Sequence, residues 1–378
     1  MMAQDPYFPE GNEFQALLEQ PGTWQSPPGL QGYSMPPEWA PHRATWLSFP
    51  HHKTDFTGKL AAMPWMFAEM ARLISQEEDV EVLCRDEREQ ERAAQVFQKA
   101  GVVSERVRYH LIPTNRSWNR DTMPIWVTTQ EQDEKKSVAV KFRFDGWARY
   151  RDHLLDDAAG IAVAKNFASQ RAFPLRHQNQ RMVLEGGSID VDEFGTLMTT
   201  ESCLLSSKLA RFQGSAPQAV EEHLKATLGV RHIVWVPDGI VGDDTSGHID
   251  DFARFAPQGR LLICQESRRE DENYLPLKAA HQALSNAVSA RGEKFELVEL
   301  PMPEAVYFDG LRLPASYANF YICNYGVLVP VFNDPMDREA LSIIADCFPQ
   351  RRVVGVYARD LVLGLGTLHC STMQEPAV

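Results

Sequence analysis

The stretch PWMFAEMARLISQEEDVEVLC, residues 64–84, decides the fold class of this chain. Residues 64–78 carry apolar side chains at the spacing of an amphipathic helix, and DVEVLC (79–84) is a short apolar stretch typical of a buried strand. A helix followed at once by a strand is the unit from which α/β folds are built.

The same unit recurs along the chain. Helical patterns at 87–101, 217–229, 274–292 and 337–349 lead into short apolar stretches at 106–112, 231–237, 294–300 and 351–358. This alternation predicts an α/β protein. Residues 1–34 are rich in proline, glycine and glutamine, so we expect them to form an N-terminal extension and residues 35–378 to form a single domain.

The composition argues against several classes of protein. The 378 residues include 38 basic and 51 acidic side chains, and the formal charge of −13 disfavours binding along a nucleic-acid backbone. This charge suits a cationic substrate, although an acidic surface that only keeps a protein soluble would account for it equally well. The six cysteines form no CxxC pair, and no apolar run is long enough for a signal peptide or a membrane span. We therefore expect a cytoplasmic protein with no membrane or nucleic-acid partner.

Polar clusters interrupt the helix–strand pattern at regular intervals. SWNRD ends at Asp121, LEGGS contains Glu185, SGHIDD contains His248, and LHC ends at Cys370. The first three lie about 60 residues apart, and the last step is about twice as long, with SYANFY (316–321) inside it. We interpret this spacing as repeated units that each lend one motif to a shared site.

Cys370 is a candidate nucleophile. A cysteine attacks as its thiolate, and Gly364 and Gly366 would let the backbone approach a bound group. A buried cysteine without chemical function is the alternative. His369 is not expected to be its base, because neighbours on an extended chain point to opposite faces. The residues beyond Cys370 are expected to be too few for another element.

His248 in DDTSGHIDD is the better candidate for an acid and base. In an extended HID sequence the side chains of His248 and Asp250 would share one face. The alternatives are a His–Asp pair that only satisfies itself at a strand end, and a zinc site. The sequence has no HExxH, no HxH and no paired cysteines to complete a zinc site, so we expect no metal.

Three more candidates stand in segments that resemble turns. WNRDTMP (118–124) places Trp118 and Asp121 in a predicted loop, where an aspartate is also ordinary turn chemistry. Glu185 precedes two glycines and a predicted hairpin, where an exposed glutamate is the simpler interpretation. Taken together, two aspartates, a glutamate, a histidine and a cysteine suit attack on the central carbon of a guanidinium group, whose planar fork carboxylates can hold.

With these residues in place, the chain resembles the agmatine deiminase and bacterial-type peptidylarginine deiminase family of the guanidine-modifying superfamily. The resemblance covers about residues 35–375 and rests on blocks in the right order: MPPEWAPHRATWLSFP, SWNRDTMP, EGGSIDVDEFGTLMTTESCLL, GDDTSGHIDDFARF, PASYANFY, GVLVPVFNDPMD, FPQRRVVGVYARDLVLG and GTLHCST. It implies a pentein fold, which is a five-bladed, pseudosymmetric α/β propeller with its active site at the central axis.

The resemblance also implies the catalytic residues. Cys370 would be the nucleophile and His248 the general acid and base. Glu185 matches a carboxylate that orients the histidine, and Asn319 matches an asparagine near the thiol in the peptidylarginine branch. The cysteine would form a covalent amidino-thioether, ammonia would leave, and water would release a ureido product without any metal or organic cofactor.

The substrate that the resemblance implies is a small cationic guanidine compound. Asp121 and Asp250 would hold its guanidinium group, and Trp118 would wall the channel. The leading expectation is agmatine, whose conversion to N-carbamoylputrescine is a step of polyamine biosynthesis. A homodimer is left open.

Departures from the family pattern fall at positions that we expect to shape the pocket, and they leave the substrate open. Leu365 interrupts a glycine run, Met123 replaces a glycine and Ser246 replaces an aspartate, and the segments 144–150 and 206–212 also differ. Peptidyl arginine is therefore an alternative substrate, and an amidinotransferase, in which an amine replaces water, is an alternative activity. A metal-dependent amidohydrolase would need ligand motifs that the sequence lacks, and a binding protein would have no use for a thiol opposite a histidine.

Overall fold

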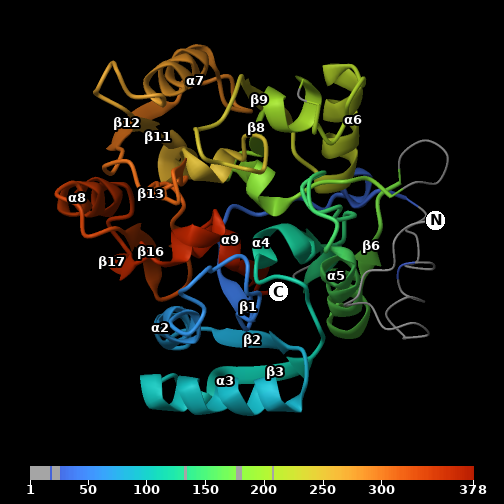
Figure 1. Cartoon of the computed structure of the whole chain (residues 1–378). Helices are drawn as coiled ribbons and strands as arrows, with labels where there is room; N and C mark the ends of the chain where they lie inside the picture. The colour runs from blue at the N-terminus through green and yellow to red at the C-terminus, as the bar shows by residue number, and fades with distance from the viewer. Residues whose placement is uncertain (1–17, 19–25, 132–133, 176–180, 207) are drawn as a thin grey trace.

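The computed structural model describes residues 18, 26–131, 134–175, 181–206 and 208–378 (Figure 1). The predicted α/β architecture is confirmed. Most of the predicted extension, residues 1–17 and 19–25, lies outside the described residues. The part that follows packs on the domain, because the 3-10 turn η1 (Pro28–Gln31) lies against a later helix and Ser34 bridges to Thr128. None of the helices in the described ranges combines the length and the apolar character of a membrane span.

The longer helices of the described residues are α2 (Met63–Ile74), α3 (Glu87–Ala100), α5 (Leu154–Phe167), α6 (Pro217–Leu228), α7 (Tyr274–Asn286) and α8 (Asp337–Cys347). All of them except α5 lie close to the predicted positions. Helix α5 was not predicted, because it is buried on all sides and its apolar residues form no stripe on one face. Helix α3 illustrates why the sequence defines its ends. Asp86 caps its first turn by accepting a hydrogen bond from the backbone N–H of Glu89 at 2.8 Å, and Gly101 ends the helix with a φ of 77°.

Four sheets share one design. Their strands are β4 (Ile125–Glu131), β5 (Glu134–Val140) and β6 (Arg171–Ala172); β7 (Ile189–Val191), β8 (Thr196–Thr200) and β9 (His232–Val236); β10 (Ala253–Ala256), β11 (Arg260–Gln265) and β12 (Glu296–Pro301); and β15 (Tyr321–Ile322), β16 (Gly326–Val331) and β17 (Arg352–Tyr357). In each sheet the first and second strands are antiparallel, and the second and third strands are parallel. One of the longer helices lies between the second and third strands in the sequence. A small hairpin, β13 (Tyr307–Phe308) and β14 (Leu311–Arg312), lies outside this design.

The fifth sheet joins the two ends of the domain. Its order is β18 (Met373–Pro376), β1 (His42–Ser48), β2 (Asp79–Cys84) and β3 (Val107–Leu111), with β18 antiparallel to β1 and the other strands parallel. The expectation that the residues beyond Cys370 are too few for another element was therefore wrong. Four residues are enough for a strand when an existing strand supplies all of its hydrogen-bond partners.

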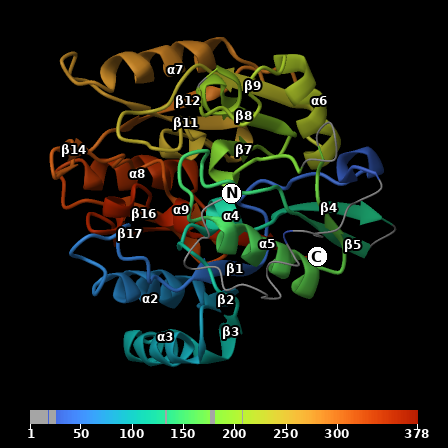
Figure 2. The same ribbon diagram turned by 45° about the vertical axis from the view of Figure 1, so that its right-hand side comes forward.

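Short segments between the sheets meet near the middle of the molecule. These are α4 (Asn119–Thr122), η4 (Gly186–Ser188), η6 (Ile249–Asp251) and α9 (Leu368–Ser371). Helix α4 contacts both α9 and η4, and η4 contacts η6. Figures 1 and 2 show α4 and α9 surrounded by the longer helices and the sheets. The predicted polar motifs thus come from different sheets and share one centre.

The local conformation of three motifs differs from the prediction. The WNRD segment is a one-turn helix rather than a loop, the HID segment turns into η6 rather than staying extended, and the LHC segment is the helical turn α9. The face-sharing argument for His248 and Asp250 and the argument against His369 both assumed an extended chain. The assumption of an extended chain was therefore wrong in both cases, although His248 and Asp250 still lie in the same central cluster.

Candidate active site

A pocket of about 200 Å³ opens beside the central segments. Of the predicted site residues, Trp118, Asp121 and Cys370 line it directly. His248, Glu185, Asp250 and Asn319 are buried in the same central cluster, each with at most 1% of its surface exposed. The predicted residues are thus brought together. Three form part of the pocket wall, and His248, Asp250 and Asn319 lie against that wall. Glu185 lies farther back, beside His248.

Cys370 lies in the helical turn α9. Its Sγ is 3.6 Å from Oδ2 of Asp250, and the side-chain N–H of Asn319 donates a hydrogen bond to it at 3.1 Å. Gly366 packs against the sulfur, since a Cβ there would lie 3.2 Å from Sγ and 3.0 Å from the ring of Trp118. This glycine is needed for space, because no larger residue would fit between the cysteine and the tryptophan.

Asp121 is held in the one-turn helix α4 by two donors from other segments. The backbone N–H of Gly187 donates to its Oδ1 at 3.0 Å, and the indole N–H of Trp147 donates to its Oδ2 at 2.8 Å. Trp147 belongs to FDGWARY, a segment in which the sequence departs from the family pattern. The carboxylate is therefore aimed into the pocket by fixed partners.

Gly187 marks the point where three functional groups converge. A Cβ at this position would lie 2.6 Å from Nδ1 of His248, 3.0 Å from Oδ1 of Asp121 and 3.1 Å from Oδ2 of Asp250. Nδ1 of His248 is also 3.9 Å from Oδ2 of Asp121. Only glycine leaves room for the histidine to approach both aspartates, which gives the EGG motif a steric reason.

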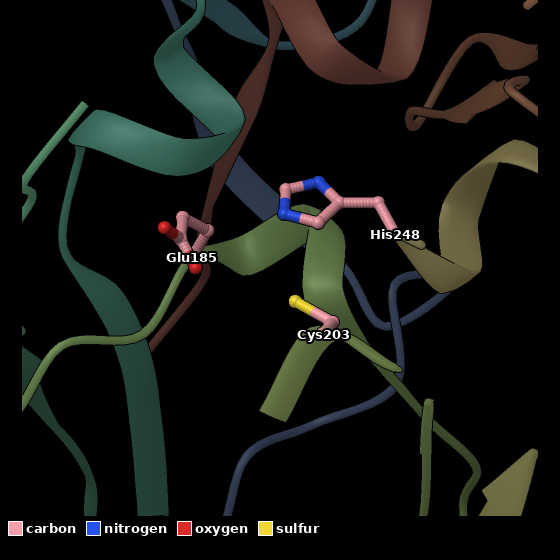
Figure 3. A group of neighbouring side chains, drawn as sticks. All are labelled: Glu185, Cys203 and His248. Carbon is pink, nitrogen blue, oxygen red and sulfur yellow. The ribbon is translucent and has the colours of Figure 1, made fainter. Parts of the chain in front are cut away.

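His248 lies beside Glu185 and Cys203 (Figure 3). One nitrogen of His248, Sγ of Cys203 and a carboxylate oxygen of Glu185 all lie within 4.8 Å of one another. Glu185 accepts hydrogen bonds from Nε of Arg211 at 2.9 and 3.0 Å, and Nη2 of Arg211 donates to the carbonyl oxygen of Thr245 at 2.9 Å. The glutamate is therefore buried and anchored, not exposed on a hairpin.

The pKa values of the thiol and the imidazole are both raised. Burial raises the pKa of the Cys370 thiol well above its ordinary value, and the charges of nearby aspartates raise it further: Asp250, Asp251 and Asp121. Burial alone would lower the pKa of His248, but the charge of Asp121 and the neighbouring Cys203 outweigh it, so this pKa lies well above its ordinary value. Without substrate, the pair consists of a neutral thiol and a protonated imidazole.

The outer part of the pocket carries both signs of charge. Arg116 lines it and pairs with Asp55 and, at 3.1 Å, with Asp152, while its guanidinium carbon lies 4.4 Å from the ring centre of Tyr150. Asp244 also lines the pocket, and the Tyr150 hydroxyl donates to its Oδ2 at 2.5 Å. Burial raises the pKa of Asp244 to about 6.

The positions that depart from the family pattern do not all face this pocket. Leu365 lines it and has a φ of 65°, a conformation that glycine adopts more readily. Met123 is buried in a core cluster, and Ser246 lines a separate hollow. The sequence argument that all three shape the pocket was therefore wrong for Met123 and Ser246.

Several residues at the site were not predicted. Arg211 and Trp147 fix the carboxylates of Glu185 and Asp121, and His369 contacts Asp250 through Nδ1 at 2.6 Å. The sequence marks their positions, because the segments 144–150 and 206–212 depart from the family pattern and His369 directly precedes the predicted nucleophile. No sequence pattern indicated which partner each side chain would contact.

Two groups of side chains have the composition of a metal site: Glu185, Cys203 and His248, and Asp250, Asp251 and Cys370. In the first group Arg211 already pairs with the glutamate, so a cation there would lie against a guanidinium group. In the second group a metal ion would occupy the place where a cationic substrate would meet the thiol. Both groups are better matched to a cationic partner that donates hydrogen bonds than to a resident metal ion.

Known proteins resemble this chain over most of its length. The sequence model of the Porphyromonas-type peptidyl-arginine deiminase family matches residues 34–376. An agmatine deiminase of Stutzerimonas stutzeri (strain A1501) is 34% identical over 378 residues, which cover 94% of this chain and 98% of that protein.

Solved structures extend the similarity to the fold. An agmatine deiminase of Enterococcus faecalis, described as catalysing its reaction, superposes with a TM-score of 0.81 at 27% identity, covering 93% of this chain and 98% of that one. An agmatine deiminase of C. jejuni with substrate bound gives a TM-score of 0.78 at 27% identity, covering 91% and 96%. The chain therefore has an α/β fold of the pentein type.

Proposed function

This chain belongs to the Porphyromonas-type peptidyl-arginine deiminase family, and we propose that it is a guanidine deiminase that converts agmatine to N-carbamoylputrescine and ammonia. The enzyme is a hydrolase of C–N bonds in linear amidines. The observation that carries the proposal is the approach of the Cys370 sulfur to Oδ2 of Asp250, 3.6 Å away, at the wall of a pocket that Asp121 also lines. A planar cation is the ligand that two carboxylates beside a thiol would hold.

We also propose that the five similar sheets form the five blades of a pseudosymmetric propeller. The shared strand order and the meeting of α4, η4, η6 and α9 at the centre support this arrangement. One sheet differs from the others by the added strand β3 and by drawing β18 from the far end of the sequence. A propeller of this kind brings one motif from each blade to a common axis.

The first half of the reaction forms a covalent intermediate. Asp121 and Asp250 hold the guanidinium, whose positive charge stabilises the thiolate of Cys370 and releases the thiol proton to solvent. The sulfur attacks the central guanidinium carbon, and one C–N bond breaks as His248 gives its proton to the departing nitrogen. The products of this half are ammonia and an amidino group bonded to sulfur.

The second half of the reaction restores the enzyme. His248, now neutral, takes a proton from a water molecule as its oxygen attacks the amidino carbon. The C–S bond then breaks and the thiolate leaves. The remaining hydroxyl proton goes to the solvent and Cys370 takes one up, so the thiol is restored and a neutral ureido product remains. Glu185, anchored by Arg211, keeps the imidazole in place through both proton transfers, and Asn319 stabilises the thiolate through its N–H. Trp118 covers the guanidinium as part of the pocket wall.

The charges of the outer pocket favour a substrate that ends in an amine. Among the described residues, Arg116 is the only lysine or arginine lining the pocket, and two aspartates already neutralise it. It is therefore poorly placed to receive a substrate carboxylate. The carboxylate of Asp244 accepts a hydrogen bond from Tyr150 through Oδ2, while its Oδ1 accepts none from the described residues. Oδ1 of Asp244 can therefore receive the distal ammonium of agmatine.

A substrate panel tests this proposal. Agmatine, free arginine, an arginine-containing peptide and butylguanidine, which lacks the amine, are each assayed for ureido product. We expect agmatine to give the highest kcat/KM, and Asp244→Asn to reduce that preference over butylguanidine. A preference for the peptide would favour peptidylarginine deimination, and transfer of the amidino group to an added amine in place of water would favour an amidinotransferase. Either result would overturn the proposed reaction.

A further inference from the structure

His369 lies between two buried carboxylates beneath the active site. Its Nδ1 is 2.6 Å from Oδ2 of Asp250, and its Nε2 is 2.6 Å from Oε2 of Glu38. The three side chains are 2%, 0% and 4% exposed for His369, Asp250 and Glu38. A histidine next to the nucleophile thus connects a proposed substrate-binding carboxylate with a residue near the start of the domain.

The contacts determine how many protons the imidazole carries. An ionised carboxylate only accepts hydrogen bonds, and a neutral imidazole has one donor and one acceptor nitrogen. With a carboxylate oxygen at each nitrogen, His369 must donate twice, unless a carboxyl group keeps the proton. Burial would keep a proton on Glu38, but the charge of Arg254 and those of His369 and Arg120 outweigh it and hold the pKa of Glu38 well below its ordinary value, so this carboxylate is ionised even apart from His369. Asp250 likewise faces two cations besides His369, namely His248 and Arg254.

Glu38 is itself fixed by several segments. Its Oε1 accepts a hydrogen bond from the backbone N–H of Ile322 at 2.8 Å. Its Oε2 pairs with Nη2 of Arg254 at 3.1 Å and with Nη2 of Arg120 at 3.2 Å. Because Arg120 precedes Asp121 in α4 and Arg254 follows η6, Glu38 ties the two segments that carry the substrate-binding aspartates to α9, which carries the nucleophile.

The arrangement leaves one oxygen of Asp250 for a ligand. Oδ2 is engaged by His369, whereas Oδ1 is buried and has no hydrogen-bond partner among the described residues. Leaving a buried carboxylate oxygen without a partner is costly, so Oδ1 is suited to receive a guanidinium N–H. The orientation of the carboxylate decides which oxygen is offered, and the contact with His369 fixes that orientation.

We propose that Glu38 and His369 are positioning residues. The cationic His369, held by Glu38, orients Asp250 so that the free Oδ1 of Asp250 faces the substrate. The positive charge of His369 also balances part of the negative charge of Asp250 beside the thiol. This inference rests on the proposed deiminase reaction. It assigns a catalytic purpose to the segment MPPEWAPH, in which Glu38 precedes the first strand.

Three substitutions test the positioning role of Glu38 and His369 by kinetics. Glu38→Gln removes the charge with little change of shape, and His369→Asn keeps a donor near the position of Nδ1 but has nothing to reach Glu38. We expect Glu38→Gln to lower kcat/KM by about tenfold to a hundredfold, as loss of a supporting partner does for metal ligands, with much of the loss in KM. His369→Asn should retain more activity than His369→Leu, because a donor to Asp250 remains.

Glu78→Gln is the matched control. Glu78 is also buried, also faces a histidine (His42, at 3.4 Å), and accepts a hydrogen bond from the backbone N–H of Asn324. It has no contact with His369 or Asp250 in the described part of the chain. We expect it to lower the thermal stability about as much as Glu38→Gln while leaving KM unchanged. Equal kinetic effects of the two substitutions would reduce Glu38 to a structural role and overturn the proposal.

A measurement that does not depend on activity covers the case in which a variant fails to fold. In the wild-type protein labelled with ¹⁵N-histidine, His369 should show protons on both ring nitrogens at neutral pH, with the signal assigned in the wild-type protein itself from through-space contacts to the residues around the ring. A neutral tautomer would overturn the proposal. Absence of deimination by the wild-type enzyme would instead reject the proposed function, which keeps the two failures distinct.

Discussion

The side-chain amide of Asn319 connects the nucleophile to the turn that precedes it. Its N–H donates to Sγ of Cys370 at 3.1 Å, while its oxygen accepts a hydrogen bond from the hydroxyl of Thr367 at 2.7 Å. Donors of this kind favour a thiolate, and a backbone hydrogen bond involving Thr367 lowers the pKa of the same thiol. These contacts oppose the surrounding carboxylates, which favour the neutral thiol.

Replacement of the sulfur should stop the reaction. We expect Cys370→Ser to reduce kcat at least about a thousandfold, because a hydroxyl is a far weaker nucleophile and loss of a nucleophile removes most of the rate enhancement. The fold should remain, as judged by circular dichroism and thermal unfolding. Cys347→Ser in α8, also a buried cysteine, is the control that should keep its activity. Normal turnover in the Cys370 variant would reject a covalent route.

The charge of Asp250 should matter for substrate binding. Asp250→Asn keeps one oxygen but removes the negative charge that faces the guanidinium, and breaking a buried charged pair costs roughly 2–5 kcal/mol. We expect at least about a thirtyfold loss in kcat/KM. Asp192→Asn makes the same exchange at a buried turn that accepts hydrogen bonds from the N–H groups of Phe194 and Thr196. Steady-state kinetics that fail to separate the two variants would mean that the guanidinium is held elsewhere.

Arg211 should support activity from behind the histidine. Arg211→Met leaves Glu185 buried without its guanidinium partner, a change worth roughly 3–5 kcal/mol of stability. We expect a lower Tm together with a lower kcat, since the imidazole loses an anchored neighbour. Adding Glu185→Gln should recover part of the Tm but not kcat, and this difference would separate the catalytic effect from the structural one. Recovery of both would assign the pair to stability alone.

The pH dependence should follow the raised pKa of the thiol. In the free enzyme the thiolate fraction of Cys370 grows as the pH rises toward that pKa, about tenfold per unit. His248, whose pKa is also raised, keeps its proton further into the alkaline range than an ordinary histidine. We therefore expect kcat/KM to increase from about pH 7 to about pH 9 and kcat, measured with the cation bound, to change less. A fall in kcat/KM over this interval would contradict the assignment of the two protonation states.

The sequence was sufficient for the fold class and for the residues that carry a distinctive chemical pattern. The longer helices other than α5 follow from their apolar spacing. Cys370, His248 and Asp121, which were chosen from motifs at regular intervals, lie in one central cluster, and their catalytic roles stay predictions. Strand β18 was missed because a segment this short carries no periodic signal of its own. It is defined by pairing with β1, where Trp46 lies opposite Met373.

The supporting contacts could not be predicted for a related reason. Trp147 reaches Asp121, Arg211 reaches Glu185, and Glu38 reaches His369 only after separate sheets have packed together. Local patterns describe which residues are buried in a helix or strand, but they do not determine which buried partner a side chain from another sheet will meet. The extended conformations assumed for the HID and LHC segments failed because tertiary packing turned both into short helices.

The contact between Glu38 and His369 spans 331 positions of the sequence. The edge strand β18 pairs with β1 across a similar separation in sequence. Such remote contacts are slow to assemble, because the chain must lose the entropy of closing a long loop before they form. During refolding, catalytic competence should consequently appear after the helices have regained their circular dichroism. The recovery of turnover would then report when these long-range contacts have formed.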